Sequence, residues 1–312
     1  VAYSAEAHYT HSRMCGVLGV PGTAVEVDGA GRIDLGALEE LLAGGSIGTV
    51  VATAGTTGLG AIDLVHEVLA VARRHGVRVH VDAAYGGFFT LLAGADGRAG
   101  LDPAPWRAIP DCDSVVVDPH KHGLQPYGCG AVLFADPGVG RLYSHDSPYT
   151  YFTSDELHLG EISLECSRAG AAAAALWLTF QLLPPRPDGL GRVLAAGRRA
   201  ALDWSELLAA SGRLRLYQPP ELDIVCYFPV TAPASLAAID QASARMLADG
   251  MTDPAHPVYL STLTVEAQAF ARRHPGIAAD AGRARILRSV LMKPESEDHI
   301  ARLHARVEDL AG

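Results

Sequence analysis

A lysine stands between two histidines in the stretch "DPHKHG", shortly after an apolar run. The run covers residues 114–117, and Lys121 is flanked by His120 and His122. A charged amine beside a buried strand is costly to desolvate unless the protein uses it. Three roles fit this residue type: a surface lysine, an anion-binding clamp, and a nucleophile that forms an imine with a carbonyl ligand.

A carboxylate occupies a comparable position at the end of another apolar run. Asp82 ends the segment "VRVHVD", whose valine content indicates a strand buried on both faces. A cationic ligand ring would remove the cost of burying this charge, and the alternative is an ordinary turn or helix-capping aspartate. A lysine for the aldehyde and an aspartate for the protonated pyridine nitrogen are two groups that pyridoxal phosphate (PLP) requires.

The elements that would position these groups alternate between strand and helix. Residues 48–53 predict a strand, residues 63–75 predict a helix capped by Asp63 and ended by Gly76, and residues 77–82 predict a second strand. A strand, a crossover helix and a strand form a βαβ unit. The pattern therefore predicts a parallel sheet in an α/β protein.

The candidate residues follow the predicted strands. Thr56 and Thr57 follow the first strand and Asp82 ends the second, while Lys121 comes after a further buried strand at residues 114–117. Ligands of open parallel sheets bind at the carboxyl ends of the strands. We therefore expect these loops, which are distant in sequence, to converge on one crevice.

The second half of the chain predicts a smaller α+β domain. An alanine-rich helix that includes residues 169–180 is followed by the break "PPRPDG" at residues 184–189. Strand candidates and two further helices follow. We expect a PLP-binding large domain over residues 1–187 and a small C-terminal domain over residues 188–312.

The composition limits the partners. The formal net charge of -10 argues against a nucleic acid or an anionic membrane surface and favours a small-molecule partner. No apolar run is long enough to span a membrane. The five cysteines are scattered without a C-x-x-C pair, so we expect a reducing, cytoplasmic location.

Three stretches together resemble the PLP-dependent group II decarboxylases, which include aromatic-L-amino-acid and glutamate decarboxylases. They are "ATAGTTGLGAID", "VHVDAAYGGFF" and "DSVVVDPHKHGLQPYGCGAVLF", and the match keeps the family's order from "SAEAHYTHSR" to "LRSVLMKP". The resemblance implies an aspartate-aminotransferase-like (fold type I) α/β fold with a mostly parallel sheet. It also implies PLP as cofactor and a carboxy-lyase activity on an L-amino acid.

Residue by residue, the resemblance implies a site. Lys121 matches the lysine that forms the Schiff base with PLP, Asp82 the partner of the pyridine nitrogen, and His8 the histidine that stacks over the ring. The remaining matches line the cofactor or lie near its phosphate: Thr57, Ala84 and His120. The family offers no role for His11 and His122, and we expect both to make local hydrogen bonds.

Two further assignments concern the chain after the lysine. In the family, a tyrosine of a mobile loop protonates the substrate carbon after carbon dioxide leaves, and Tyr149 and Tyr151 are both candidates here. Loss of that donor can divert such enzymes toward oxidative deamination. Arg168 matches an arginine near the start of a large-domain helix, with packing, dimer contact and carboxylate binding as open roles.

The family's N-terminal region contributes to dimer formation and phosphate binding, and it has no counterpart in this chain. The resemblance therefore implies an N-terminally incomplete large domain. It also implies that the full-length protein is a homodimer with its site at the subunit interface.

Three alternatives stay open on the sequence. A carbon-carbon lyase similar to sphingosine-phosphate lyase has a related lysine neighbourhood, and a non-catalytic protein could keep the fold as a binding module. A metal-dependent hydrolase would use histidines at H-x-x-H and H-x-H spacing, although it leaves the lysine unexplained. Its candidate ligand pairs are His8 with His11, His80 with Asp82, and His120 with His122.

Overall fold

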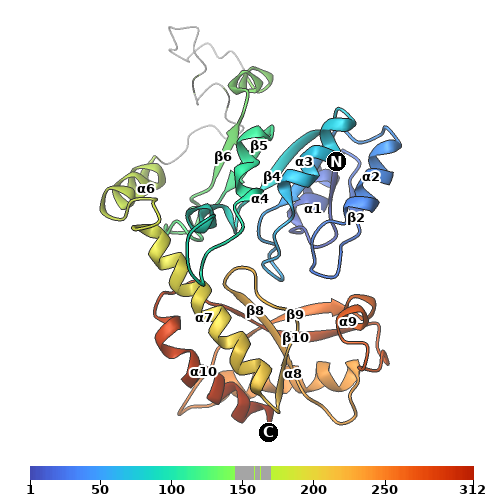
Figure 1. The fold of residues 1–312 in the computed structure, drawn as a ribbon, viewed down its shortest axis with the longest axis vertical. Helices are drawn as coiled ribbons and strands as arrows, with labels where there is room; N and C mark the ends of the chain where they lie inside the picture. The colour runs from blue at the N-terminus through green and yellow to red at the C-terminus, as the bar shows by residue number, and fades with distance from the viewer. Residues whose placement is uncertain (145–157, 159–161, 163–169) are drawn as a thin grey trace.

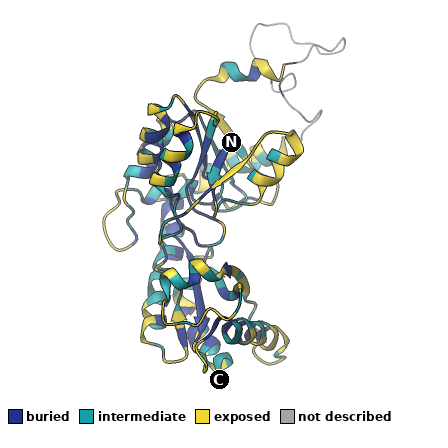
Figure 2. Cartoon of the chain, turned by 90° about the vertical axis from the view of Figure 1, so that its right-hand side faces the viewer, coloured by how far each residue is buried: buried dark blue, intermediate teal, exposed yellow. Residues whose placement is uncertain are grey.

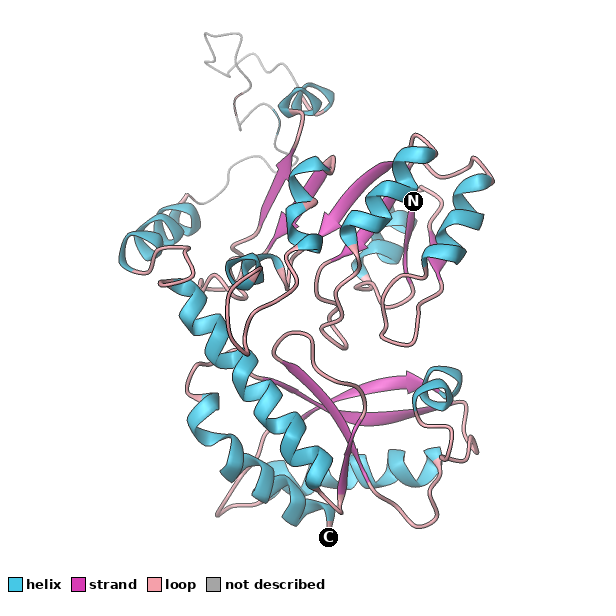
Figure 3. Cartoon of the chain, in the orientation of Figure 1, coloured by secondary structure: helices cyan, strands magenta, loops and turns pink. Residues whose placement is uncertain are grey.

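The computed structural model describes residues 1–144, 158, 162 and 170–312. Within these residues the chain forms two parts, each built on one sheet (Figure 1). The N-terminal part contains the larger sheet, and the C-terminal part contains the smaller one. Figure 3 shows that loops of the first part face the strands of the second.

The larger sheet has the strand order β2-β1-β3-β4-β5-β6. Its strands are β1 (Ala2–Ser4), β2 (Thr23–Val25), β3 (Thr49–Thr53), β4 (Arg78–Asp82), β5 (Ser114–Val117) and β6 (Ala131–Phe134). Strands β1 to β5 pair in parallel, and β6 pairs antiparallel with β5. The predicted parallel sheet and its βαβ unit are confirmed.

The helices of this part are α1 (Thr10–Leu18), α2 (Leu35–Ala43), α3 (Val65–Arg74), α4 (Ala104–Arg107) and α6 (Ala171–Leu182), with short 3-10 helices η1 (Gly87–Leu92), η2 (Ile109–Asp111) and η3 (Pro137–Leu142). Of these, α2 and α3 pack against the sheet through buried apolar residues. In α3, Val65, Val68 and Val71 recur at helical spacing and are buried. They pack with Val79 and Val81 of β4 in one hydrophobic core.

Helix α3 ends as predicted but begins differently. Gly76 has a φ of 66°, which suits the residue that follows a helix. The predicted cap is wrong, because Leu64 occupies the cap position. The Asp63 carboxylate is buried and accepts hydrogen bonds from the backbone N–H groups of Ile33 and Thr53, both at 2.7 Å. Burial raises the pKa of Asp63 to about 6, although both N–H groups lower it.

The smaller sheet is antiparallel, with the order β7-β8-β10-β9. Its strands are β7 (Leu214–Leu216), β8 (Ile224–Pro229), β9 (Ser261–Glu266) and β10 (Arg283–Val290). The helices of this part are α7 (Leu190–Ala210), α8 (Leu236–Thr252), α9 (Ala267–Arg273) and α10 (Ser296–Ala311). Trp204 of α7, Tyr227 of β8 and Val307 of α10 meet in its core.

A second core joins the two parts. Phe89 of η1, Leu190 of α7, and Ile224 and Ile286 of the smaller sheet belong to one cluster and are buried. Figure 2 shows buried residues inside both parts. Because the parts share a core, the boundary predicted after residue 187 stays a prediction. In the described portion of the chain, no helix has the length and apolar character that crossing a bilayer requires.

The buried Asp63 carboxylate gives a prediction about stability. At pH 7.5, above the pKa of about 6, the group is ionised. Asp63→Asn replaces one acceptor oxygen with an amide, which leaves a buried backbone N–H without a partner. We expect the free energy of unfolding to fall by about 1–3 kcal/mol in urea denaturation.

Asp34→Asn is the matched control for this variant. Asp34 caps α2 by accepting the N–H of Ala37, and asparagine caps a helix about equally well. Its cost should stay below about 0.5 kcal/mol. Equal costs for the two variants would contradict the role given to Asp63.

Candidate active site

A cavity of about 220 Å³ lies at the carboxyl ends of β3, β4 and β5. The register of the three strands explains the position of the cavity. Thr53 of β3 pairs with Asp82 of β4, and Asp82 in turn pairs with Val116 of β5. Loops that leave these strands therefore start at one edge of the sheet. Five of the residues that the resemblance assigns to the site line the cavity: His8, Thr57, Asp82, Ala84 and Lys121.

Lys121 lies in a tight turn after β5. Its backbone N–H donates to the carbonyl of Asp118 at 2.9 Å, and its Nζ lies 2.8 Å from Asp118 Oδ2. Gly123 belongs to the same turn, where a Cβ would lie 2.7 Å from Pro119 Cα. The amine thus reaches the cavity already paired with a carboxylate. Sequence reasoning missed Asp118, although its position three residues before the lysine was a usable signal.

Asp82 is held by a histidine of α1. His11 Nε2 donates to Asp82 Oδ2 at 2.8 Å, and the Ala84 N–H donates to Oδ1 at 3.1 Å. Burial alone would raise the pKa of Asp82, but the hydrogen bond and charge of His11, with the Ala84 N–H, hold it below its ordinary value. The expectation of a local hydrogen bond for His11 is wrong, because its partner is 71 residues away.

His8 lines the same cavity from the start of α1. Its Nδ1 lies 2.7 Å from Thr10 Oγ1 and accepts the Thr10 N–H at 3.3 Å. Burial lowers the pKa of His8, as do the charges of Lys121 and His11, against the opposing effect of Asp82. A neutral, flat imidazole thus borders the cavity. Its stacking on a cofactor ring stays a prediction.

The loop that follows β3 and contains Gly55, Thr56 and Thr57, named here the Gly-Thr loop, is held by hydrogen bonds from the smaller sheet. Arg288 of β10 donates to the carbonyl of Thr57 at 2.6 Å and to that of Gly58 at 3.0 Å. Within the loop, the Ala61 N–H donates to Thr56 Oγ1 at 3.0 Å. The two parts of the chain therefore shape the cavity together, and Arg288 is a further residue that sequence reasoning missed.

The histidines beside the lysine point elsewhere. His120 is not among the residues that line the cavity, and its Nδ1 donates to the Cys129 carbonyl at 2.8 Å. Its place near a phosphate stays a prediction. His122 is buried and contacts Asp223 and the Tyr85 carbonyl, at 2.8 and 3.0 Å. The local hydrogen bond expected for His122 is therefore wrong as well.

Other candidates fall outside the described residues: Tyr149, Tyr151 and Arg168. Three histidines of the metal alternative have hydrogen-bond partners outside their proposed ligand pairs. His11 contacts Asp82, His80 Nδ1 lies 2.8 Å from Ser114 Oγ, and His122 contacts Asp223. Among residues 1–144, 158, 162 and 170–312, no three His, Cys, Asp or Glu side chains gather in a way that could hold a metal ion.

The groups around the cavity fit PLP. Lys121 offers an amine, Asp82 an ionised carboxylate and His8 a flat ring. Thr53 adds an independent observation. Its Oγ1 is buried at the cavity and has no hydrogen-bond partner within the described part of the protein. A buried hydroxyl without a partner fits a polar ligand in this position.

The chain is similar in sequence to known proteins. The family description "Pyridoxal-dependent decarboxylase conserved domain" matches residues 1–229. The chain is 30% identical over 240 residues to the L-tyrosine decarboxylase of Enterococcus faecium. This match covers 64% of this chain and 39% of that protein. It is also 30% identical over 240 residues to the probable L-tyrosine/L-aspartate decarboxylase of Methanothermobacter thermautotrophicus, covering 74% of this chain and 61% of that one.

Solved structures show the same fold. Mouse CSAD in its apo form matches with a TM-score of 0.80 at 24% identity, over 99% of this chain and 63% of that chain. The predicted fold type I architecture, with a mostly parallel sheet and a smaller antiparallel one, is confirmed. This chain spans 39% and 61% of the length of the two curated relatives. With the family description matching residues 1–229, the chain belongs to the pyridoxal-dependent decarboxylase family.

Proposed function

We propose that the full-length protein is a PLP-dependent decarboxylase that removes the α-carboxyl group of an L-amino acid as carbon dioxide. Family membership supports the reaction class. The observation that carries the proposal is the meeting of the Lys121 amine and the Asp82 carboxylate in one cavity. These are the two groups that hold an aldehyde and a pyridine nitrogen at opposite ends of one ring.

The residues of this chain have distinct tasks in that proposal. PLP, when bound, supplies an electron-poor ring that takes up the electron pair left by the departing carboxyl group. Lys121 holds the cofactor covalently, and Asp118 Oδ2, 2.8 Å from Nζ, can take the proton that the amine must lose. Asp82, kept ionised by His11, holds a proton on the pyridine nitrogen. His8, Ala84 and Thr57, which line the cavity, would border the bound ring.

The substrate is proposed at the level of a class. The relatives are named for L-tyrosine, L-aspartate and L-2,4-diaminobutyrate, whose side chains share neither charge nor shape. Their common part is the α-amino acid group, which the reaction requires. The proton that replaces the carboxyl group is assigned to Tyr149 or Tyr151, both outside the described residues.

Exposed apolar surface supports the proposed homodimer. Helix α6 leaves Trp177, Leu178 and Leu182 exposed by 65%, 54% and 80%, and the edge strand β6 exposes Val132 and Leu133. Apolar patches of this kind mark protein interfaces. A cytoplasmic location is part of the same proposal, and the four described cysteines are free thiols.

The lysine assignment can be tested by mapping the labelled peptide, and within this chain the two lysines to compare are Lys121 and Lys293. Borohydride reduction of the full-length protein with PLP should label the peptide that contains Lys121. Lys121→Ala should abolish the label and lower the rate of carbon dioxide release by about 10³-fold or more.

Lys293→Ala is the matched control for this experiment. Lys293 is exposed and lies after β10, so its loss should leave labelling and turnover as in the wild type. A label on Lys293, or normal turnover without Lys121, would refute the assignment.

His11 should control the affinity for PLP through Asp82. His11→Leu removes a hydrogen bond that keeps the pKa of Asp82 low, so Asp82 becomes protonated at higher pH. A hydrogen bond to a charged group contributes about 1.5–3 kcal/mol, which corresponds to about 10- to 100-fold weaker PLP binding. The loss should be greater at pH 6 than at pH 8, as measured by fluorescence titration.

The neighbouring variant Ser12→Ala serves as control, because Ser12 only donates to the Tyr9 carbonyl on the exposed side of α1. It should bind PLP like the wild type at both pH values. If His11→Leu bound PLP equally well at pH 6 and pH 8, Asp82 would not depend on His11.

The dimer is tested by placing a charge on α6. Trp177→Glu should shift the full-length protein from dimer to monomer in sedimentation velocity, because a buried unpaired carboxylate opposes association. Tyr259, which is 80% exposed in the C-terminal part, provides the control Tyr259→Glu. A stable dimer in the α6 variant would show that this face is not the interface.

A further inference from the structure

A buried polar cluster lies on the side of the lysine turn away from the cavity. His122 follows Lys121 directly, and its side chain is only 3% exposed. Its Nε2 lies 2.8 Å from Asp223 Oδ2, and its Nδ1 lies 3.0 Å from the Tyr85 carbonyl oxygen. The Asp223 side chain is 2% exposed. Both side chains are therefore almost fully excluded from bulk solvent.

Tyr85 completes the cluster. Its hydroxyl donates to Asp223 Oδ1 at 2.5 Å, while its other side lines the cavity that holds Lys121. Burial and the Asp223 charge raise the pKa of Tyr85 well above its ordinary value, so the hydroxyl keeps its proton. The His122 ring also lies edge-on to Tyr85 and Phe89, at centroid distances of 4.6 and 4.8 Å. We name Tyr85, His122 and Asp223 the clamp.

Counting hydrogens shows that the clamp is fully connected. A backbone carbonyl can only accept, so His122 Nδ1 donates to Tyr85. Asp223 Oδ1 accepts from the Tyr85 hydroxyl, and one proton lies between His122 Nε2 and Asp223 Oδ2. Every polar atom of the three side chains therefore has a partner. Such buried networks hold one geometry, because any displaced member leaves an unsatisfied group.

The clamp connects the smaller sheet to the lysine. Asp223 immediately precedes β8, and its carbonyl accepts the N–H of Leu291, which follows β10, at 2.9 Å. On the other side, His122 and Lys121 are consecutive in a turn that allows little movement. Leu124 in that turn has a φ of 58°, and Gly123 packs on Pro119. His122, which is hydrogen-bonded to Asp223 beside the smaller sheet, is thus joined to Lys121 by a single peptide bond.

We propose that the clamp is a positioning unit, through which Asp223 and His122 fix the Lys121 amine for reaction with its carbonyl ligand. This inference rests on the proposed function of Lys121. It differs from a purely structural role, because a structural pair would stabilise the fold without changing how the amine reacts.

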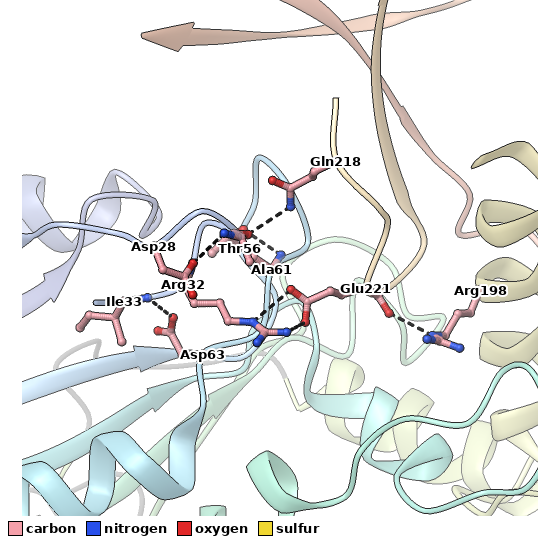
Figure 4. Close-up of polar contacts among 10 residues, drawn as sticks. Asp28, Arg32, Ile33, Thr56, Ala61, Asp63, Arg198, Gln218 and Glu221 are labelled. Atoms are coloured by element: carbon pink, nitrogen blue, oxygen red, sulfur yellow. Dashed lines mark hydrogen bonds and ion pairs between the residues drawn. The ribbon is translucent and has the colours of Figure 1, made fainter. Parts of the chain in front are cut away.

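A second contact between the same two parts provides the comparison. Arg32 donates to both carboxylate oxygens of Glu221, at 2.7 and 3.3 Å, and the Glu221 carbonyl accepts from Arg198 at 3.0 Å (Figure 4). Glu221 lies two residues before Asp223 but does not contact the lysine turn through any of these bonds. Glu221→Gln therefore weakens the junction without touching the clamp.

The test compares Asp223→Asn with Glu221→Gln in the full-length protein. Thermal melting of the PLP-free protein measures the structural effect, and PLP titration with borohydride trapping measures the reaction of Lys121. We expect both variants to melt at lower temperature. Only Asp223→Asn should weaken PLP binding and slow trapping, by about 10- to 100-fold, as small misplacements of reacting groups do. Wild-type binding by Asp223→Asn, or an equal loss in Glu221→Gln, would overturn the proposal.

Lysine labelling separates this proposal from the proposed function. Without PLP, a limiting dose of acetic anhydride labels Lys121 and Lys293, and mass spectrometry gives their ratio. Asp223→Asn should raise labelling of Lys121 relative to Lys293 several-fold, because an amine that is no longer held beside Asp118 is more accessible to a small reagent that needs no defined geometry. Glu221→Gln should leave the ratio unchanged. An unchanged ratio overturns the clamp, whatever the protein does with PLP. A wild-type protein that takes up no PLP contradicts the proposed function instead.

A second pair of variants covers a failure of Asp223→Asn to fold. His122→Gln keeps an amide donor toward Asp223, and His122→Leu removes it. At equal stability of the two folded variants, the glutamine should retain more of the PLP affinity and of the wild-type labelling ratio. Equal values for both variants would show that the hydrogen bond does not position the lysine.

Discussion

The parallel register of β3, β4 and β5 is the constraint on which the site depends. Pairing of Thr53 with Asp82 and of Asp82 with Val116 brings three strand ends to one edge of the sheet. A slip of one residue would turn Asp82 to the other face, because successive side chains alternate. Val79 and Val81, which lie on one face of β4 and are buried in the core, oppose such a slip. Hydrophobic packing thus fixes where a carboxylate and an amine can meet.

Charge pairing lowers the cost of placing the Asp82 carboxylate and the Lys121 amine at one cavity. Asp82 has His11 and the Ala84 N–H, while Lys121 has Asp118. An unpaired charge at the buried Asp82 would lose solvation that the fold could not replace, whereas Lys121, 32% exposed, keeps part of its solvation. The arrangement keeps the carboxylate ionised and leaves the amine next to a proton acceptor. Electrostatics and stability therefore require the same contacts as the proposed chemistry.

The smaller sheet supports the cavity, although none of its described residues is among those that line it. Arg288 holds the carbonyls of the Gly-Thr loop, and Asp223 holds the turn that contains Lys121 through His122. The shared core around Phe89 and Ile224 brings these contacts within reach. A movement of the smaller sheet would displace both the Gly-Thr loop and the turn that contains Lys121, because hydrogen bonds join each of them to that sheet.

The sequence by itself determined the elements and the motif. Valine-rich runs, helical spacing from Val65 and a glycine at position 76 are local signals, so they predicted strands and a helix without knowledge of neighbours. The ordered motifs indicated the family and the lysine. Only the tertiary structure decided the partners: His11 contacts Asp82 across 71 residues, His122 contacts Asp223 across 101, and Asp63 binds the backbone instead of capping a helix. Contacts at such separations depend on how whole elements pack, and no local pattern encodes that.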